Sequence, residues 1–178
     1  MRRLIAPAAA LLLFACSQPA QTPAAPPPTA GPAQTPTLAC NDVAPDAAAP
    51  VQVEAGALAA AALPPDLPGG PITPGVYDLR RIQAVDDAPA WTANRPAALA
   101  VTEGPDGVVF NWADAPAGAA PDRWTASFRE GPPAQLNFSC GRSGAAPIAF
   151  SASAAELRQR LPAANGEGGY QMVLARRT

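Results

Sequence analysis

The last hundred residues of the chain alternate between apolar and polar positions with a period of two, which is typical of strands that bury one face. Residues 123–130 place Trp124 and Phe128 on the apolar face, and residues 134–140 place Cys140 on theirs. The Glu-Gly-Pro-Pro segment between the two runs contains turn residues and cannot continue a central strand. The pattern therefore predicts an antiparallel hairpin.

A second hairpin is predicted from residues 99–103 and 108–113, which flank the turn sequence Gly-Pro-Asp-Gly. Residues 76–82 form the predicted first strand, and residues 170–176 form the predicted last one. A shorter apolar run at residues 148–150 is consistent with one more strand.

One helix is predicted between the last strands. Ser153 and Glu156 have the spacing of a capping box. Leu157 and Leu161 would share one side of a helix that ends before Pro162.

These elements predict an all-β, mainly antiparallel fold with one short helix, in which the strands follow one another as a meander. A small barrel or a sandwich would bury the single apolar face of each strand. An immunoglobulin-like sandwich is the main alternative, although the chain lacks two cysteines on adjacent strands around a core tryptophan. We expect the β domain to span residues 76–178 and an irregular, proline-rich arm to span residues 38–75.

The first sixteen residues have the pattern of an export signal, with two arginines followed by an apolar run from Leu4 to Ala15. The run is too short to span a bilayer as a permanent helix. The sequence Leu-Phe-Ala-Cys that ends at Cys16 resembles the lipobox of bacterial lipoproteins. This resemblance implies removal of residues 1–15, a lipid on Cys16 and a tether to a membrane outside the cytoplasm. The alternative is an ordinary signal peptide with an incidental cysteine.

Residues 17–37 consist only of Ser, Gln, Pro, Ala, Thr and Gly. Such a composition buries too little apolar surface to order the chain, so we expect residues 16–37 to be a lipid anchor with a disordered linker. Ser17 follows the cysteine at the place where an aspartate favours retention in the inner membrane of Gram-negative lipoproteins. The resemblance therefore implies the outer membrane, with the domain facing the periplasm.

Two cysteines remain once Cys16 carries a lipid, and cysteines in an oxidising compartment are expected to pair. We predict a disulfide between Cys40 and Cys140, with Cys140 on the inward face of its strand. The bond would close a loop of about 100 residues and hold the arm on the sheet. A redox-active pair is the alternative, but no C-x-x-C spacing supports it.

The sequence Gly-Val-Tyr-Asp-Leu at residues 75–79 opens the predicted first strand, and residues 170–177 close the last one. In these two segments the chain resembles the small lipocalin-like lipoproteins. The resemblance implies a lipocalin-like fold and assigns no ligand or site.

Histidine is absent from the chain, which excludes Ser-His-Asp and Cys-His catalysis and imidazole metal ligands. There is no run of acidic residues with the spacing of a calcium site, so we predict no metal and no cofactor. Residues 141–144, Gly-Arg-Ser-Gly, resemble the start of the G-x-S-x-G nucleophile elbow, but Ala145 stands where that motif has its second glycine. The segment therefore predicts a tight turn. After removal of residues 1–15, ten arginines remain against fourteen carboxylates, which argues against a nucleic-acid partner.

Carboxylates remain as candidate catalytic groups, because glycoside hydrolysis needs only a pair of them. Asp86, Asp87, Asp114, Asp122 and Glu130 lie in predicted loops or at strand ends, where acidic residues are usually solvated. We therefore predict that the protein is not an enzyme, with a carboxylate-dependent hydrolase as the least favoured alternative.

Aromatic residues are the remaining candidates for a binding site. Trp112, Trp124 and Phe128 would line an apolar pocket if the domain contains a cavity, and a filled core is the alternative. Trp91 falls in a predicted loop, where its indole would be an exposed contact residue. We predict an envelope lipoprotein whose β domain binds a small apolar molecule or another envelope protein. A structural or assembly role without a ligand is the alternative.

Overall fold

The computed structural model describes residues 39–59, 67–118 and 120–178. The predicted signal, the lipidation site Cys16 and the linker of residues 16–37 lie outside these ranges. Within them the chain forms eleven strands and no helix, so the predicted all-β, mainly antiparallel fold is confirmed. The described residues accordingly include no helix that could span a membrane. The strands are β1 (Gln52–Val53), β2 (Pro68–Gly69), β3 (Gly75–Val85), β4 (Ala97–Gly104), β5 (Gly107–Asp114), β6 (Asp122–Arg129), β7 (Gln135–Cys140), β8 (Ala145–Pro147), β9 (Ala149–Ala152), β10 (Glu156–Pro162) and β11 (Gly169–Arg176).

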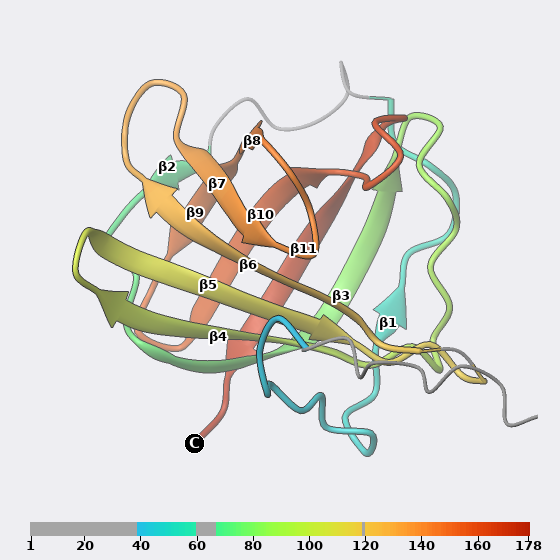
Figure 1. The fold of residues 1–178 in the computed structure, drawn as a ribbon. Helices are drawn as coiled ribbons and strands as arrows, with labels where there is room; N and C mark the ends of the chain where they lie inside the picture. Colours follow the sequence, from blue (N-terminus) through green and yellow to red (C-terminus); the bar gives the residue numbers. More distant parts are fainter. Residues whose placement is uncertain (1–38, 60–66, 119) are drawn as a thin grey trace, which may run out of the picture. The chain divides into compact units, whose positions relative to one another are not determined.

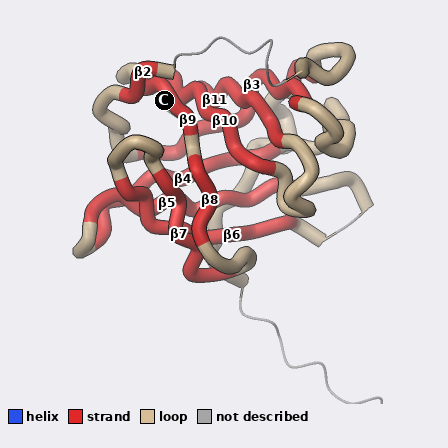
Figure 2. The backbone as a smooth tube through the Cα atoms, turned by 90° about the horizontal axis from the view of Figure 1, so that it is seen from above, coloured by secondary structure: helices blue, strands red, loops and turns tan. Residues whose placement is uncertain are grey.

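One curled sheet contains all of these strands, in the order β2-β9-β10-β11-β3-β4-β5-β6-β7-β8, with β1 paired to β3 beside this path. β3 and β11 lie side by side and antiparallel, as Figure 1 shows. The strands curve around a common interior (Figure 2), but β2 and β8, which end this order, are not partners in the sheet. The domain is therefore a half-barrel that stays open between β2 and β8.

Both hairpins expected from the sequence are present. β4 pairs with β5 across a turn in which Gly104 is opposite Gly107, and β6 pairs with β7. The glycine at 107 has a φ of 116°, a backbone conformation that residues with a side chain rarely adopt. The turn chemistry thus fixes the register that turns Phe110 and Trp112 toward the interior.

The predicted helix at residues 153–161 is wrong, because this segment forms a turn followed by β10. The Ser153 hydroxyl does accept a hydrogen bond from the Glu156 backbone N–H at 3.1 Å, as in a capping box. However, Leu157, Gln159 and Leu161 are all buried, which is a period of two. A spacing of four residues places the two leucines on one face of a helix or of a strand. The segment is a strand because it pairs with β9 and β11.

The arm before β3 covers part of the outer face of the sheet. Val43 packs with Ala98 and Ala113, whose side chains point away from the main core. The Asn41 side-chain amide donates to the backbone carbonyls of Trp112 and Trp124 at 3.1 and 3.0 Å. Strands β5 and β6 are consequently packed on both faces, with the interior on one side and the arm on the other.

The disulfide between Cys40 and Cys140 is present in the structure. The predicted inward direction of Cys140 is wrong. An irregularity in the β6–β7 register pairs Cys140 with Thr125, while Phe138 pairs with Ala126. Residues opposite each other share a face, and the Thr125 hydroxyl donates to the Cys40 carbonyl oxygen at 3.2 Å. The bulge therefore turns Cys140 outward, toward the arm.

Candidate ligand-binding site

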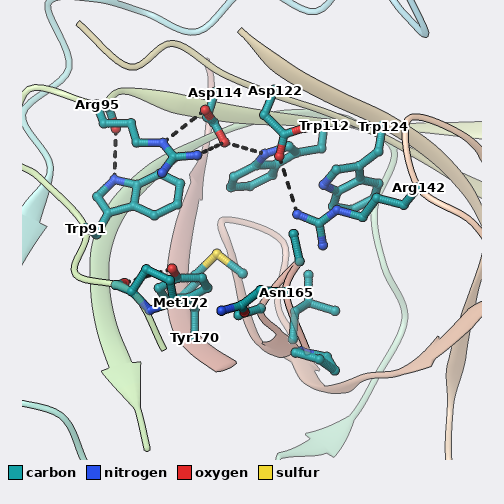
Figure 3. A pocket seen from close by; sticks show the side chains of 15 residues that line it. Trp91, Arg95, Trp112, Asp114, Asp122, Trp124, Arg142, Asn165, Tyr170 and Met172 are labelled. Atoms are coloured by element: carbon teal, nitrogen blue, oxygen red, sulfur yellow. Dashed lines mark hydrogen bonds and ion pairs between the residues drawn. The ribbon is translucent and has the colours of Figure 1, made fainter. Parts of the chain in front are cut away.

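A cavity of about 220 Å³ lies at one end of the half-barrel, where β5, β7 and β10 end and β6 and β11 begin. Figure 3 shows its two walls, with tryptophans, arginines and aspartates on one side and Tyr170, Met172 and Asn165 on the other. The lining residues are Pro89, Trp91, Arg95, Trp112, Asp114, Asp122, Trp124, Arg142, Leu161, Pro162, Ala163, Ala164, Asn165, Tyr170 and Met172. The cavity is thus mainly apolar, with a few charged groups at one wall, as small-molecule sites usually are.

Two tryptophans on neighbouring strands form the centre of the aromatic wall. Trp112 on β5 is directly opposite Trp124 on β6 in the register, and their rings stack with centroids 5.9 Å apart. Both side chains are almost completely buried. Cross-strand pairing with a common inward face holds the rings parallel, and the pair forms an apolar wall of the cavity.

Trp91 completes this wall from the loop between β3 and β4. Its indole N–H donates to the Arg95 carbonyl at 3.0 Å, and its ring meets Trp112 and Tyr170 edge to face. The exposed fraction of Trp91 is only 8%. The prediction of an exposed contact residue is therefore wrong, because the loop folds back and turns the indole into the cavity.

Arg95 and Asp114 form a closely matched ion pair beside Trp91. Two nitrogens of the guanidinium donate to the two carboxylate oxygens of Asp114 at 3.0 and 2.8 Å. The Trp112 indole N–H donates to the same carboxylate at 3.3 Å. The guanidinium also lies 3.9 Å from the centre of the Trp91 ring. Arg95 therefore balances the charge of Asp114, and both carboxylate oxygens of Asp114 already accept hydrogen bonds.

Arg142 enters the cavity from the predicted tight turn between β7 and β8. Gly141 in this turn has a φ of 76°, and a side chain there would collide with the backbone of Arg123. The Arg142 guanidinium lies 5.4 Å from the centre of the Trp124 ring. A single contact of 3.5 Å joins it to Asp122, whose side chain is 40% exposed. This ion pair is much looser than that of Arg95.

Two N–H groups at this end of the cavity, Trp124 Nε1 and Arg142 Nε, are buried and have no hydrogen-bond acceptor among the described residues. A third polar group lies near the cavity on β10. Gln159 is fully buried opposite Phe150 and Met172, and its amide oxygen and nitrogen also lack partners in the described part of the chain. Unsatisfied buried groups are rare, so such a concentration is unusual.

Tyr170 contributes to the wall opposite the tryptophans. Its hydroxyl donates to the Pro89 carbonyl at 2.8 Å, which ties β11 to the loop that carries Trp91. Burial raises the pKa of the Tyr170 phenol, and the nearby positive charge of Arg95 lowers it to a smaller extent. The phenol is therefore neutral at physiological pH.

The structure brings Trp91, Trp112 and Trp124 together at the cavity but places Phe128 elsewhere. The Phe128 ring stacks on Phe110 and meets Phe150 edge to face, so it belongs to the filled part of the core.

Sequence reasoning missed Arg95, Arg142, Tyr170 and Met172 as lining residues. The pairing of the first and last long strands, which a closed meander implies, was the signal that could have placed Tyr170 and Met172 near the tryptophans.

Of the candidate carboxylates, Asp114 and Asp122 line the cavity and are opposite each other in the β5–β6 register. Asp86, Asp87 and Glu130 do not line it. Each of the two lining carboxylates faces its own arginine. No group of three or more potential metal ligands occurs among the described residues.

Comparison with known proteins adds no relative: no family model, curated protein or solved structure matches the chain.

Proposed function

We propose that this protein is a non-catalytic binding protein of the cell envelope, tethered by a lipid on Cys16, whose half-barrel holds a small ligand between Trp112 and Trp124 on one side and Met172 on the other. The observation that carries the proposal is the tryptophan-lined cavity. A filled core would have favoured a structural role. An apolar cavity with a few polar groups at one wall instead fits a ligand site.

The surface of the described residues supports a small ligand over a protein partner. Trp91 is buried, and Val53 is the exposed large hydrophobic residue found in this part of the chain. Protein interfaces usually centre on a patch of exposed aromatic and aliphatic side chains. Four aromatic side chains of the described residues, Trp91, Trp112, Trp124 and Tyr170, instead line the cavity.

A hydrolase that uses Asp114 and Asp122 is the second candidate, because both carboxylates line one cavity. A catalytic carboxylate must reach the reacting atoms with an oxygen that is free of other partners. Here an arginine pairs with each of them, and Asp114 is fully engaged by Arg95 and Trp112. The arrangement favours binding over hydrolysis.

Native mass spectrometry of the full chain, extracted in mild detergent from its own membrane, tests this proposal. We expect a protein mass that begins at an acylated Cys16 and a second species that carries a non-covalent small molecule. Ala164 is exposed at the cavity, so Ala164→Trp should block it and remove the second species.

The matched control is Ala154→Trp, at an exposed turn position that does not line the cavity, which should retain the bound molecule. A bound molecule that persists in Ala164→Trp, or its absence from the unmodified protein, would contradict ligand binding at this site. An unmodified Cys16 would contradict the tether alone.

A further inference from the structure

Trp124 and Arg142 present two hydrogen-bond donors to the same end of the cavity. Trp124 is 1% exposed, and neither its Nε1 nor the Arg142 Nε has an acceptor within the described ranges. Figure 3 shows the guanidinium of Arg142 extending along the cavity side of Trp124, with the indole nitrogen facing the same space. Neither group can accept a hydrogen bond, so both need an acceptor, which a ligand in the cavity would supply.

The charges around these donors favour an anionic acceptor. Asp114 balances Arg95 through two hydrogen bonds. By contrast, one contact of 3.5 Å with the partly exposed Asp122 leaves most of the donors of Arg142 available. Guanidinium groups bind carboxylates through parallel N–H donors, and such charge-assisted bonds are the strong ones.

The rest of the cavity limits the size and shape of the ligand. Its volume of about 220 Å³ is below that of typical sites for drug-sized molecules. Trp112 and Trp124 form one apolar wall, and Met172 lies on the opposite one. These walls fit a small apolar body.

We propose that the cavity binds a small monocarboxylate with an apolar body, whose carboxylate accepts hydrogen bonds from Trp124 Nε1 and Arg142 Nε. This inference rests on the proposed binding function and specifies its ligand class. A dianion such as a phosphate monoester fits less well, because Asp122 lies within 3.5 Å of the same arginine and would repel the second charge.

The test compares 2-naphthoate with naphthalene-2-carboxamide, which has nearly the same shape and no charge. Binding is followed through the indole N–H resonances of the three tryptophans in a proton–nitrogen correlation spectrum of the full chain in detergent. We expect naphthoate to shift the Trp124 resonance downfield and to bind roughly tenfold to a hundredfold more tightly than the carboxamide.

Two variants remove one donor each. Trp124→Phe keeps an aromatic ring, and Arg142→Met keeps most of the side-chain length. Each should bring the affinity for naphthoate close to that for the carboxamide. Arg158→Met is the matched control, since Arg158 is 59% exposed on β10 and does not line the cavity, and it should retain the preference.

The outcomes separate this inference from the proposed function. Equal affinity for the two probes, or an unchanged preference in both Trp124→Phe and Arg142→Met, would overturn the carboxylate assignment and leave the cavity as a ligand site. If neither probe shifts a tryptophan resonance, both the carboxylate assignment and the proposed binding site are overturned.

Discussion

Gln159 is the residue whose environment differs most from what its side chain requires. It is fully buried between Phe150 and Met172, without a partner for its amide among the described residues. Replacing a buried unsatisfied amide with an apolar group of similar shape removes its desolvation penalty, about 1–3 kcal/mol. We expect Gln159→Met to increase the free energy of unfolding by an amount in this range, measured by urea denaturation.

Gln52→Met is the control, because Gln52 is exposed and its replacement should change the free energy of unfolding by less than about 0.5 kcal/mol. A destabilised Gln159→Met protein would instead show that the amide binds a buried water or a ligand.

The two tyrosines of the chain predict how its stability depends on pH. Burial raises the pKa of both Tyr77 and Tyr170 above the ordinary value of 10.0. The unfolded chain then loses its phenolic protons at lower pH than the folded protein, so stability is complete below about pH 10 and decreases as the pH rises above it. Tyrosinate absorbance in an alkaline titration should show no phenol that ionises with the ordinary pKa until the chain unfolds. A folded protein that titrates one tyrosine at the ordinary pKa would contradict this account.

Single residues show why the site was only partly predictable. The period of two correctly predicted that Trp112 and Trp124 point inward, because this direction depends only on the local alternation of apolar and polar residues. The direction of Trp91 depends on how a loop folds back, and the direction of Cys140 depends on a bulge. Neither a loop path nor a bulge changes the alternation of the sequence, so both predictions failed.

At the scale of elements, the disulfide and Asn41 attach the arm to the outer face of β5 and β6. We expect the Cys40→Ser/Cys140→Ser protein to lose about 2–5 kcal/mol of stability, because the bond closes a loop with a sequence separation of 100 residues. Asn41→Ala should cost less, on the order of 1–2 kcal/mol for two hydrogen bonds. Urea denaturation under oxidising conditions measures both.

The Asn41→Ala protein with its disulfide intact serves as the comparison for the serine double variant. Equal losses in the two proteins would mean that the bond acts only by placing Asn41. A loss below about 1 kcal/mol in the double variant would mean that the arm stays attached without it.

Elements were predictable where turn chemistry and alternation agreed. The β4–β5 hairpin has both, and it forms as expected around the turn between Gly104 and Gly107. The segment of β10 has a local helix-start signal that is realised as a turn, while its strand depends on pairing with β9 and β11. Pairing between distant segments is decided by the whole sheet, which local sequence does not reveal.

At the scale of the molecule, the meander and the pairing of its first and last long strands follow from one apolar face per strand. The cavity does not, because it forms where loops after β3, β7 and β10 meet at one end. The sequence predicted Trp91, Trp112 and Trp124 as contact residues and missed Arg95, Arg142, Tyr170 and Met172.

The Cys40–Cys140 bond also determines how the domain responds to mechanical tension. A pull applied before Cys40 and at Thr178 passes through the disulfide, which bypasses the strands from β1 to β7. Only the 38 residues after Cys140 (178 − 140) can then be extended, to about 130 Å at ~3.4 Å per residue. The strands that carry Trp112 and Trp124 stay outside the path of the load, while β11 with Tyr170 is drawn away. The oxidation state of one bond thus decides whether tension unravels the whole sheet or only its last four strands.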